Sequence, residues 1–312
     1  MRMTSLRRLA LPLTAALLLG ACSGKDQPAT PGGNSPEAAV QASIDLLKKG
    51  DFDGLWKHAL PPTDYANMVA DWDQQRAHAE PVSAEDRARF DEAMQKLTGP
   101  DAETKLYAEL EPQLIAMEQQ YKDQLPTLIT VGQAVLKSGV AQSDSLEQQQ
   151  KDQANAVIDV IGPWASQTNW FDHDKARQAI GVATSTARKL DLKDPDQVRS
   201  LAFDAAMGKL STGYVGVKQI LDIYGLSVDE TLDSVKLTPV SSADGHAVVK
   251  VDYTLLGKPL STETKLVQQD GRWYSEDMLE NARKSHEKLQ EQQAAQPDEA
   301  TPAEAGSAAA DH

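Results

Sequence analysis

The chain contains a single cysteine, Cys22, and this thiol is the most reactive side chain that its sequence offers. Cysteine reacts as a nucleophile through its thiolate. Cys22 directly follows Leu19-Gly20-Ala21, which ends a leader with three arginines near its start and an apolar run over residues 9–19. The leader has the charged and apolar regions of a secretory signal, and the run is shorter than the roughly 20 residues that span a bilayer. We therefore expect export, with cleavage between Ala21 and Cys22.

Leu19-Gly20-Ala21-Cys22 resembles the lipobox of bacterial lipoproteins. The resemblance implies that the Cys22 sulfur receives a diacylglyceryl group and that its new amine is then acylated, for example by palmitate. Two or more acyl chains anchor a protein stably, since each buried methylene contributes about 0.8 kcal/mol. Ser23 stands where inner-membrane retention signals have aspartate. The resemblance therefore implies attachment to the outer membrane of a Gram-negative bacterium, at its periplasmic face. The alternative is an ordinary secreted protein with an unmodified thiol.

A second group of reactive residues is Trp170-Phe171-Asp172-His173-Asp174, with two carboxylates around an imidazole. A metal site needs three or four ligands that converge from separate segments, whereas these are neighbours in sequence. We interpret Asp172 as a helix cap and the aromatic residues as core. The sequence has no motif of a metalloprotease, serine hydrolase, nucleotide-binding loop or calcium loop. We expect no metal, no cofactor and no catalytic residue.

The chain is strongly acidic, with a net charge of −15 that becomes −18 when the three leader arginines are removed. Such a charge repels nucleic acid and anionic lipid headgroups, so we expect no nucleic-acid partner. With one cysteine the chain has no internal disulfide. Its body must be stabilised by packing alone.

The apolar pattern divides the chain into three parts after the leader, residues 1–21. Residues 22–35 are rich in Pro, Gly and Ser and predict a flexible spacer. Residues 36–285 predict a folded body, in which helices follow one another from 36 to about 230. Pro112 should kink or split one of these helices, and Gly162-Pro163 should end another. Residues 286–312 predict a polar, largely disordered extension.

The periodicity changes from 3.6 to 2 over residues 234–276, which predicts four strands. Asp244-Gly245, Gly257-Lys258 and Asp270-Gly271 fall between them at hairpin positions. The predicted fold is therefore α+β and predominantly helical. It consists of a four-stranded antiparallel C-terminal meander packed on N-terminal helices, with a long all-helical insertion.

Two segments far apart in sequence, residues 46–52 (LLKKGDF) and 269–274 (QDGRWY), resemble the two ends of a nuclear-transport-factor-2-like cone domain. The resemblance implies that residues 36–81 and 232–285 form one cone-like half, with residues 82–231 inserted. Such cones serve as enzymes and as binding modules, so no activity follows. Five aromatic residues are candidates for lining a cone cavity, although core packing is the ordinary alternative: Trp56, Tyr65, Trp72, Tyr253 and Trp273.

These observations favour a lipid-anchored, non-enzymatic binding or scaffold module for an envelope component. An inhibitor of a periplasmic enzyme is one specific version. The expected partners are the membrane, through the lipid, and an envelope protein. The alternative is an enzyme or small-ligand carrier that uses the aromatic cavity.

Overall fold

The computed structural model describes residues 29–78, 80–144 and 146–294. The predictions about the leader, Cys22 and the end of the C-terminal extension lie outside these residues. The chain is 68% helical with one antiparallel sheet, which confirms the predicted fold class. In chain order the elements are α1 (Pro36–Lys49), α2 (Phe52–Ala59), α3 (Pro62–Ala77), α4 (Ala84–Thr98), α5 (Ala102–Tyr121), α6 (Leu125–Gln142), α7 (Gln148–Gln167), α8 (His173–Leu190), α9 (Pro195–Arg199), α10 (Phe203–Ile223), α11 (Val228–Asp233), β1 (Lys236–Ala243), β2 (His246–Leu255), β3 (Lys258–Gln269), β4 (Arg272–Ser275) and α12 (Glu276–Ala294).

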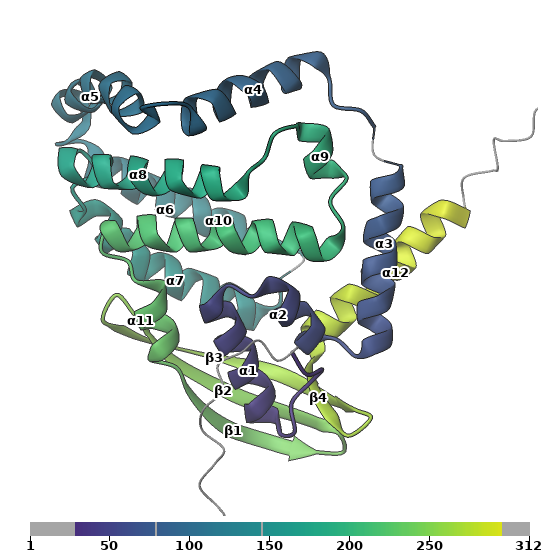
Figure 1. Cartoon of the computed structure of the whole chain (residues 1–312). Coiled ribbons are helices and arrows are strands. Elements are labelled where there is room, and N and C mark those ends of the chain that lie inside the picture. The colour runs from purple at the N-terminus through teal and green to yellow at the C-terminus, as the bar shows by residue number, and fades with distance from the viewer. Residues whose placement is uncertain (1–28, 79, 145, 295–312) are drawn as a thin grey trace, which may run out of the picture.

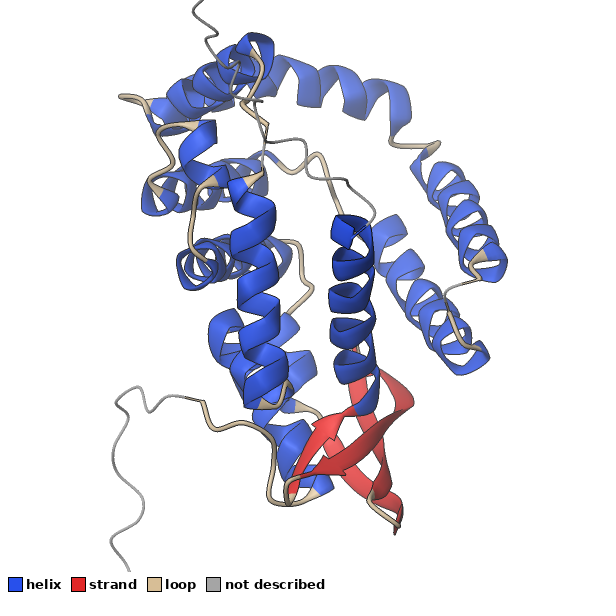
Figure 2. Ribbon diagram, turned by 90° about the vertical axis from the view of Figure 1, so that its right-hand side faces the viewer, coloured by secondary structure: helices blue, strands red, loops and turns tan. Residues whose placement is uncertain are grey.

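The sheet lies at one end of the molecule, and helices extend away from it (Figures 1 and 2). α1 and α2 cross the sheet, whereas α4 to α8 and α10 form a layered helical body above them (Figure 1). α12 follows β4 and runs along α3. There Arg283 forms a bidentate ion pair with Asp64, in which Nε and Nη2 donate to the two carboxylate oxygens at 2.8 and 2.9 Å. Within the described residues, no helix combines the length and the apolar character needed to cross a membrane.

The sheet is a meander in the order β1-β2-β3-β4, as the alternating pattern predicted. Asp244-Gly245 and Asp270-Gly271 form two of its turns, with positive φ at both residues, as two-residue hairpin loops of this type require. The middle turn differs by one residue from the prediction. Leu255 pairs with Lys258, so the turn is Leu256-Gly257. The sequence pattern misses it because leucine rarely adopts positive φ.

One apolar core joins α1 to the sheet. Ala39 of α1 packs with Val249, Leu266 and Trp273 of the sheet, and all four are buried. α1 is well specified by its sequence: Ser35 caps it, Pro36 occupies the first turn, and Gly50 ends it in the left-handed conformation. Residues separated by more than 200 positions therefore share a core.

The expectation that Gly162-Pro163 ends a helix is wrong, because α7 continues to Gln167. Proline removes one helical hydrogen bond and crowds the preceding turn. The neighbouring helix α6 packs closely against this part of α7, and the Gln133 side-chain amide donates to the Ile158 carbonyl at 3.0 Å. A side chain at position 162 would block this approach, because a Cβ there would lie 1.7 Å from the Gln133 amide nitrogen. Pro112 likewise lies inside α5 and does not split it.

The predicted flexible spacer is too long at its C-terminal end. Residues 30–34 are hydrogen-bonded to α2 and β4, including an antiparallel bridge between Gly33 and Trp273. Composition suggested a spacer because the segment has no large apolar side chain. Its backbone, however, supplies donors and acceptors to the edge of the sheet.

We expect the junction between α5 and α8 to lose stability in acid. The Arg188 guanidinium bonds both carboxylate oxygens of Glu103, at 2.5 and 3.1 Å. These hydrogen bonds, with one from Thr184, lower the pKa of Glu103 to about 2. A lowered folded-state pKa contributes stability above the ordinary carboxyl pKa, and the contribution disappears as the pH falls through about 2. Urea unfolding of wild type and Glu103→Gln should therefore differ at pH 7 and converge toward pH 2, whereas Glu287→Gln on α12 serves as the unaffected control.

Candidate functional site

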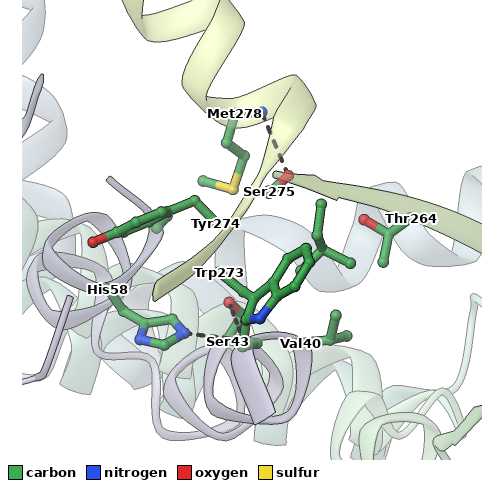
Figure 3. A pocket seen from close by; sticks show the side chains of 11 residues that line it. Val40, Ser43, His58, Thr264, Trp273, Tyr274, Ser275 and Met278 are labelled. Carbon is green, nitrogen blue, oxygen red and sulfur yellow. Dashed lines mark hydrogen bonds between the residues drawn. The ribbon is translucent and has the colours of Figure 1, made fainter. Parts of the chain in front are cut away.

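A pocket of about 160 Å³ lies between α1, α2 and the sheet (Figure 3). Its wall combines apolar side chains with a few hydroxyl groups and one imidazole. It is lined by Ala39, Val40, Ser43, His58, Ala59, Thr264, Leu266, Trp273, Tyr274, Ser275 and Met278. Ligand pockets for drug-sized molecules usually measure about 300–1,000 Å³. This pocket is thus limited to a small molecule.

His58 is the most polar residue of the pocket wall and is only 4% exposed. Its Nδ1 lies 2.8 Å from the Thr30 carbonyl oxygen, and its Nε2 lies 2.9 Å from the Ala39 carbonyl oxygen. Carbonyl oxygens only accept hydrogen bonds, so the doubly protonated ring can donate to both and a neutral ring to one. The Ser43 hydroxyl donates to the same Ala39 carbonyl at 3.1 Å. The His58 ring and the Ser43 hydroxyl therefore form hydrogen bonds with backbone carbonyls of the protein itself, which leaves them less available to a ligand.

The structure distributes the five candidate aromatic residues over several places. Tyr65 and Trp72 of α3 both pack edge-on against the buried Phe203 of α10, with ring centroids 6.0 and 5.8 Å away. Tyr253 contacts Gln153 of α7. Trp273 lines the pocket at the sheet, and the other four are not among the residues of its wall. Trp56 is half-buried on α2.

The Trp170–Asp174 segment contains the N-terminal cap and the first residues of α8. Asp172 caps the helix by accepting from the backbone of Asp174 and Lys175, both at 3.0 Å, and these bonds lower the pKa of Asp172. Phe171 belongs to a buried apolar cluster, and His173 lies 2.6 Å from the Tyr107 hydroxyl. Within the described residues, no group of three metal-ligating side chains comes together. Burial and local hydrogen bonds therefore account for this segment.

A second candidate site is an apolar surface that sequence reasoning did not single out. Four large side chains of α6 are about half to two-thirds exposed: Leu128 at 50%, Val131 at 57%, Val135 at 66% and Leu136 at 60%. Beside them an open groove of about 420 Å³ runs between α6 and α7. Its lining is almost entirely apolar and consists of Leu128, Ile129, Gly132, Gln133, Leu136, Ile158, Ile161, Gly162 and Ala165. We call this groove together with Val131 and Val135 the α6/α7 surface.

One sequence signal marks the α6/α7 surface in retrospect. From residue 124 to 143 the chain has no acidic residue and one basic residue, Lys137, although the whole protein is strongly acidic. Periodicity alone predicts that α6 has an apolar face. It does not say whether another helix covers that face.

Comparisons with family models, with curated proteins and with solved structures give no match for this chain.

Proposed function

We propose that the protein is a lipid-anchored lipoprotein of the outer membrane that faces the periplasm and binds a partner protein through the α6/α7 surface. The lipobox-like Leu19-Gly20-Ala21-Cys22 motif supports the anchor. The exposed apolar face of α6 carries the binding part of the proposal. The partner supplies an amphipathic helix on a protein of net positive charge.

The size and shape of the α6/α7 surface support a helix as the bound element. Exposed apolar area on this scale is unusual on a soluble protein and marks interaction sites. The groove runs beside the 18-residue helix α6, whose length corresponds to about 27 Å. Gly132 has open space above it, so a partner's backbone can approach closely there. These are the features of helix-in-groove recognition.

Charge supports a protein partner over an anionic surface. The α6/α7 surface has one ion pair at its edge, Lys137 with Asp159 at 2.5 Å, and no other charged residue within α6. The surrounding protein carries a large negative charge. This field attracts a positively charged protein and increases its association rate.

The position of α6 supports a partner in the periplasm rather than the bilayer. α6 lies behind α8 and α10 in Figure 1, whereas α1, where the chain arrives from its N-terminal segment, lies in front at the sheet end. The α6 helix therefore lies on the opposite side of the molecule from α1. An enzyme or ligand-carrier function has weaker support, because the pocket at the sheet is small and its imidazole, that of His58, is hydrogen-bonded to two backbone carbonyls.

We expect the double substitution Val131→Glu, Val135→Glu to abolish partner binding. A photocrosslinker at Ile129 in intact cells identifies the bound protein, and its affinity is then measured with purified components. Two buried carboxylates in the groove contact should weaken binding by about 100-fold or more. The folded body should be unchanged, because both valines are exposed.

The matched control is Val217→Glu on α10, where the side chain is 54% exposed outside the α6/α7 surface. It should bind like the wild type. Equal affinity of the double variant and the wild type would contradict the proposal. Crosslinks to lipid, or to a second copy of this chain, would also overturn it and assign the surface to the bilayer or to self-association.

A further inference from the structure

Residues 30–34, here called the clasp, are hydrogen-bonded to the folded body at the point where the chain enters it. The Arg272 side chain holds it through three groups: Nε donates to the Pro31 carbonyl and Nη2 to the Gly32 carbonyl, both at 2.9 Å, and Nη1 donates to the Asn34 side chain. Hydrogen bonds from a charged donor are about twice as strong as neutral ones. One side chain of β4 therefore secures three residues of the N-terminal segment.

Backbone hydrogen bonds secure the same segment from two directions. Gly33 and Trp273 exchange two of them, each 2.9 Å long, and Gly32 donates to the His58 carbonyl at 2.8 Å. Only glycine fits at position 33, because a Cβ there would lie 2.3 Å from the Ala39 backbone nitrogen. The sequence Pro31-Gly32-Gly33-Asn34 is thus suited to docking rather than to free movement.

We propose that the clasp sets how far the body can move from the membrane and that its release extends this reach. This inference rests on the proposed lipid anchor at Cys22. With the clasp closed, eight residue steps separate Cys22 from Thr30, which corresponds to at most about 28 Å. With the clasp open, fourteen steps lead to Pro36, the first residue of α1, or at most about 49 Å. Opening lengthens the tether by about 21 Å, so the α6/α7 surface can meet its partner farther from the membrane.

The clasp and the pocket at the sheet share residues, so a molecule bound in the pocket would affect the clasp. His58 and Trp273 contribute to both, since they bond the clasp through their backbone and line the pocket with their side chains. The ring of Tyr274, another pocket residue, lies so close to Gly32 that a Cβ at position 32 would be 2.9 Å from it. A small molecule in the pocket would therefore contact the same residues that keep the clasp closed.

The test compares wild type, Arg272→Ala and Asn34→Ala, with Arg177→Ala on α8 as the control arginine. Amide hydrogen exchange of the full chain in detergent reports clasp opening without any need for a membrane. We expect the Gly33 and Trp273 amides to exchange about tenfold faster or more in Arg272→Ala, and less so in Asn34→Ala. The amides of α8 should keep their protection in both variants, which shows that the body remains folded.

Reach is measured in proteoliposomes of neutral phospholipid by energy transfer from a dye at Val240→Cys to headgroup-labelled lipid. If Cys22 is lipidated, the introduced thiol is the single free one. Arg272→Ala should lower the transfer, and Arg177→Ala should not. Faster exchange without partition into liposomes would overturn the anchor and with it the role in reach, whereas normal partition with unchanged exchange and transfer would overturn the clasp alone.

Discussion

Cys22→Ser should remove the lipid from the protein and leave the leader uncleaved. Serine lacks the thiolate that accepts the diacylglyceryl group. Without acyl chains, each of which contributes about 0.8 kcal/mol per buried methylene, stable anchoring is lost. We expect palmitate incorporation to fall to background and the protein in the outer-membrane fraction to fall about tenfold or more. Labelling, membrane fractionation and intact mass measure these changes.

The folded body should survive this substitution. Within the part of the chain that the structure describes, hydrogen bonds to distant segments begin at Thr30, and the buried clusters contain no residue before Ala39. Circular dichroism and thermal unfolding of the detergent-solubilised variant should therefore match the wild type. Ser23→Asp is the matched control, because the resemblance predicts that it keeps the lipid but retains the protein at the inner membrane. An intact N-terminal methionine on the wild type, or an unmodified sulfur on protein shed from cells, would contradict the anchor.

Local signals predicted most of the fold because caps and turns act over a few residues. Ser35 and Gly50 bound α1, and Asp172 caps α8 as its spacing indicated. Asp244-Gly245 and Asp270-Gly271 form the hairpin turns, since their backbone conformations are rare for most other residues. Such features stabilise the same structure wherever they occur in a chain.

Errors appeared where a distant segment supplies what the local sequence lacks. Gly162-Pro163 stays within α7, where α6 packs closely against it and Gln133 bonds the Ile158 carbonyl. Residues 30–34 are ordered because Arg272, about 240 positions away, holds their carbonyls. Neither contact can be inferred from a short window. Contacts from distant segments therefore decide whether a helix continues past a proline and whether a polar, glycine-rich segment is docked on the body.

The candidate site was harder to predict than the fold for a related reason. The aromatic residues were chosen for their type, yet Tyr65 and Trp72 surround Phe203 while Trp273 lies in the sheet core. The α6/α7 surface depends on which helix faces remain uncovered. Only the assembled helical body decides this, because α7 covers one side of α6 and leaves Val131 and Val135 in solvent.

Trp273→Ala should be the most destabilising single substitution in the sheet half. The Trp273 side chain is 8% exposed and packs with Ala39, Val249 and Leu266, so its removal opens a cavity between α1 and the sheet. Truncation of a buried tryptophan costs about 3–5 kcal/mol. That loss is a large share of the total stability of a typical protein, about 5–15 kcal/mol. Urea unfolding followed by circular dichroism measures it.

The control for this prediction is Val240→Ala on β1, which removes an apolar side chain that is 54% exposed. Its free energy of unfolding should stay within about 0.5 kcal/mol of the wild type. Amide exchange then separates the two halves of the molecule: Trp273→Ala should accelerate exchange in α1 and the sheet before it does so in α8. A loss of less than about 1 kcal/mol for Trp273→Ala, below the ordinary cost of such a cavity, would mean that α1 is held on the sheet by the clasp and by its neighbours rather than by this core.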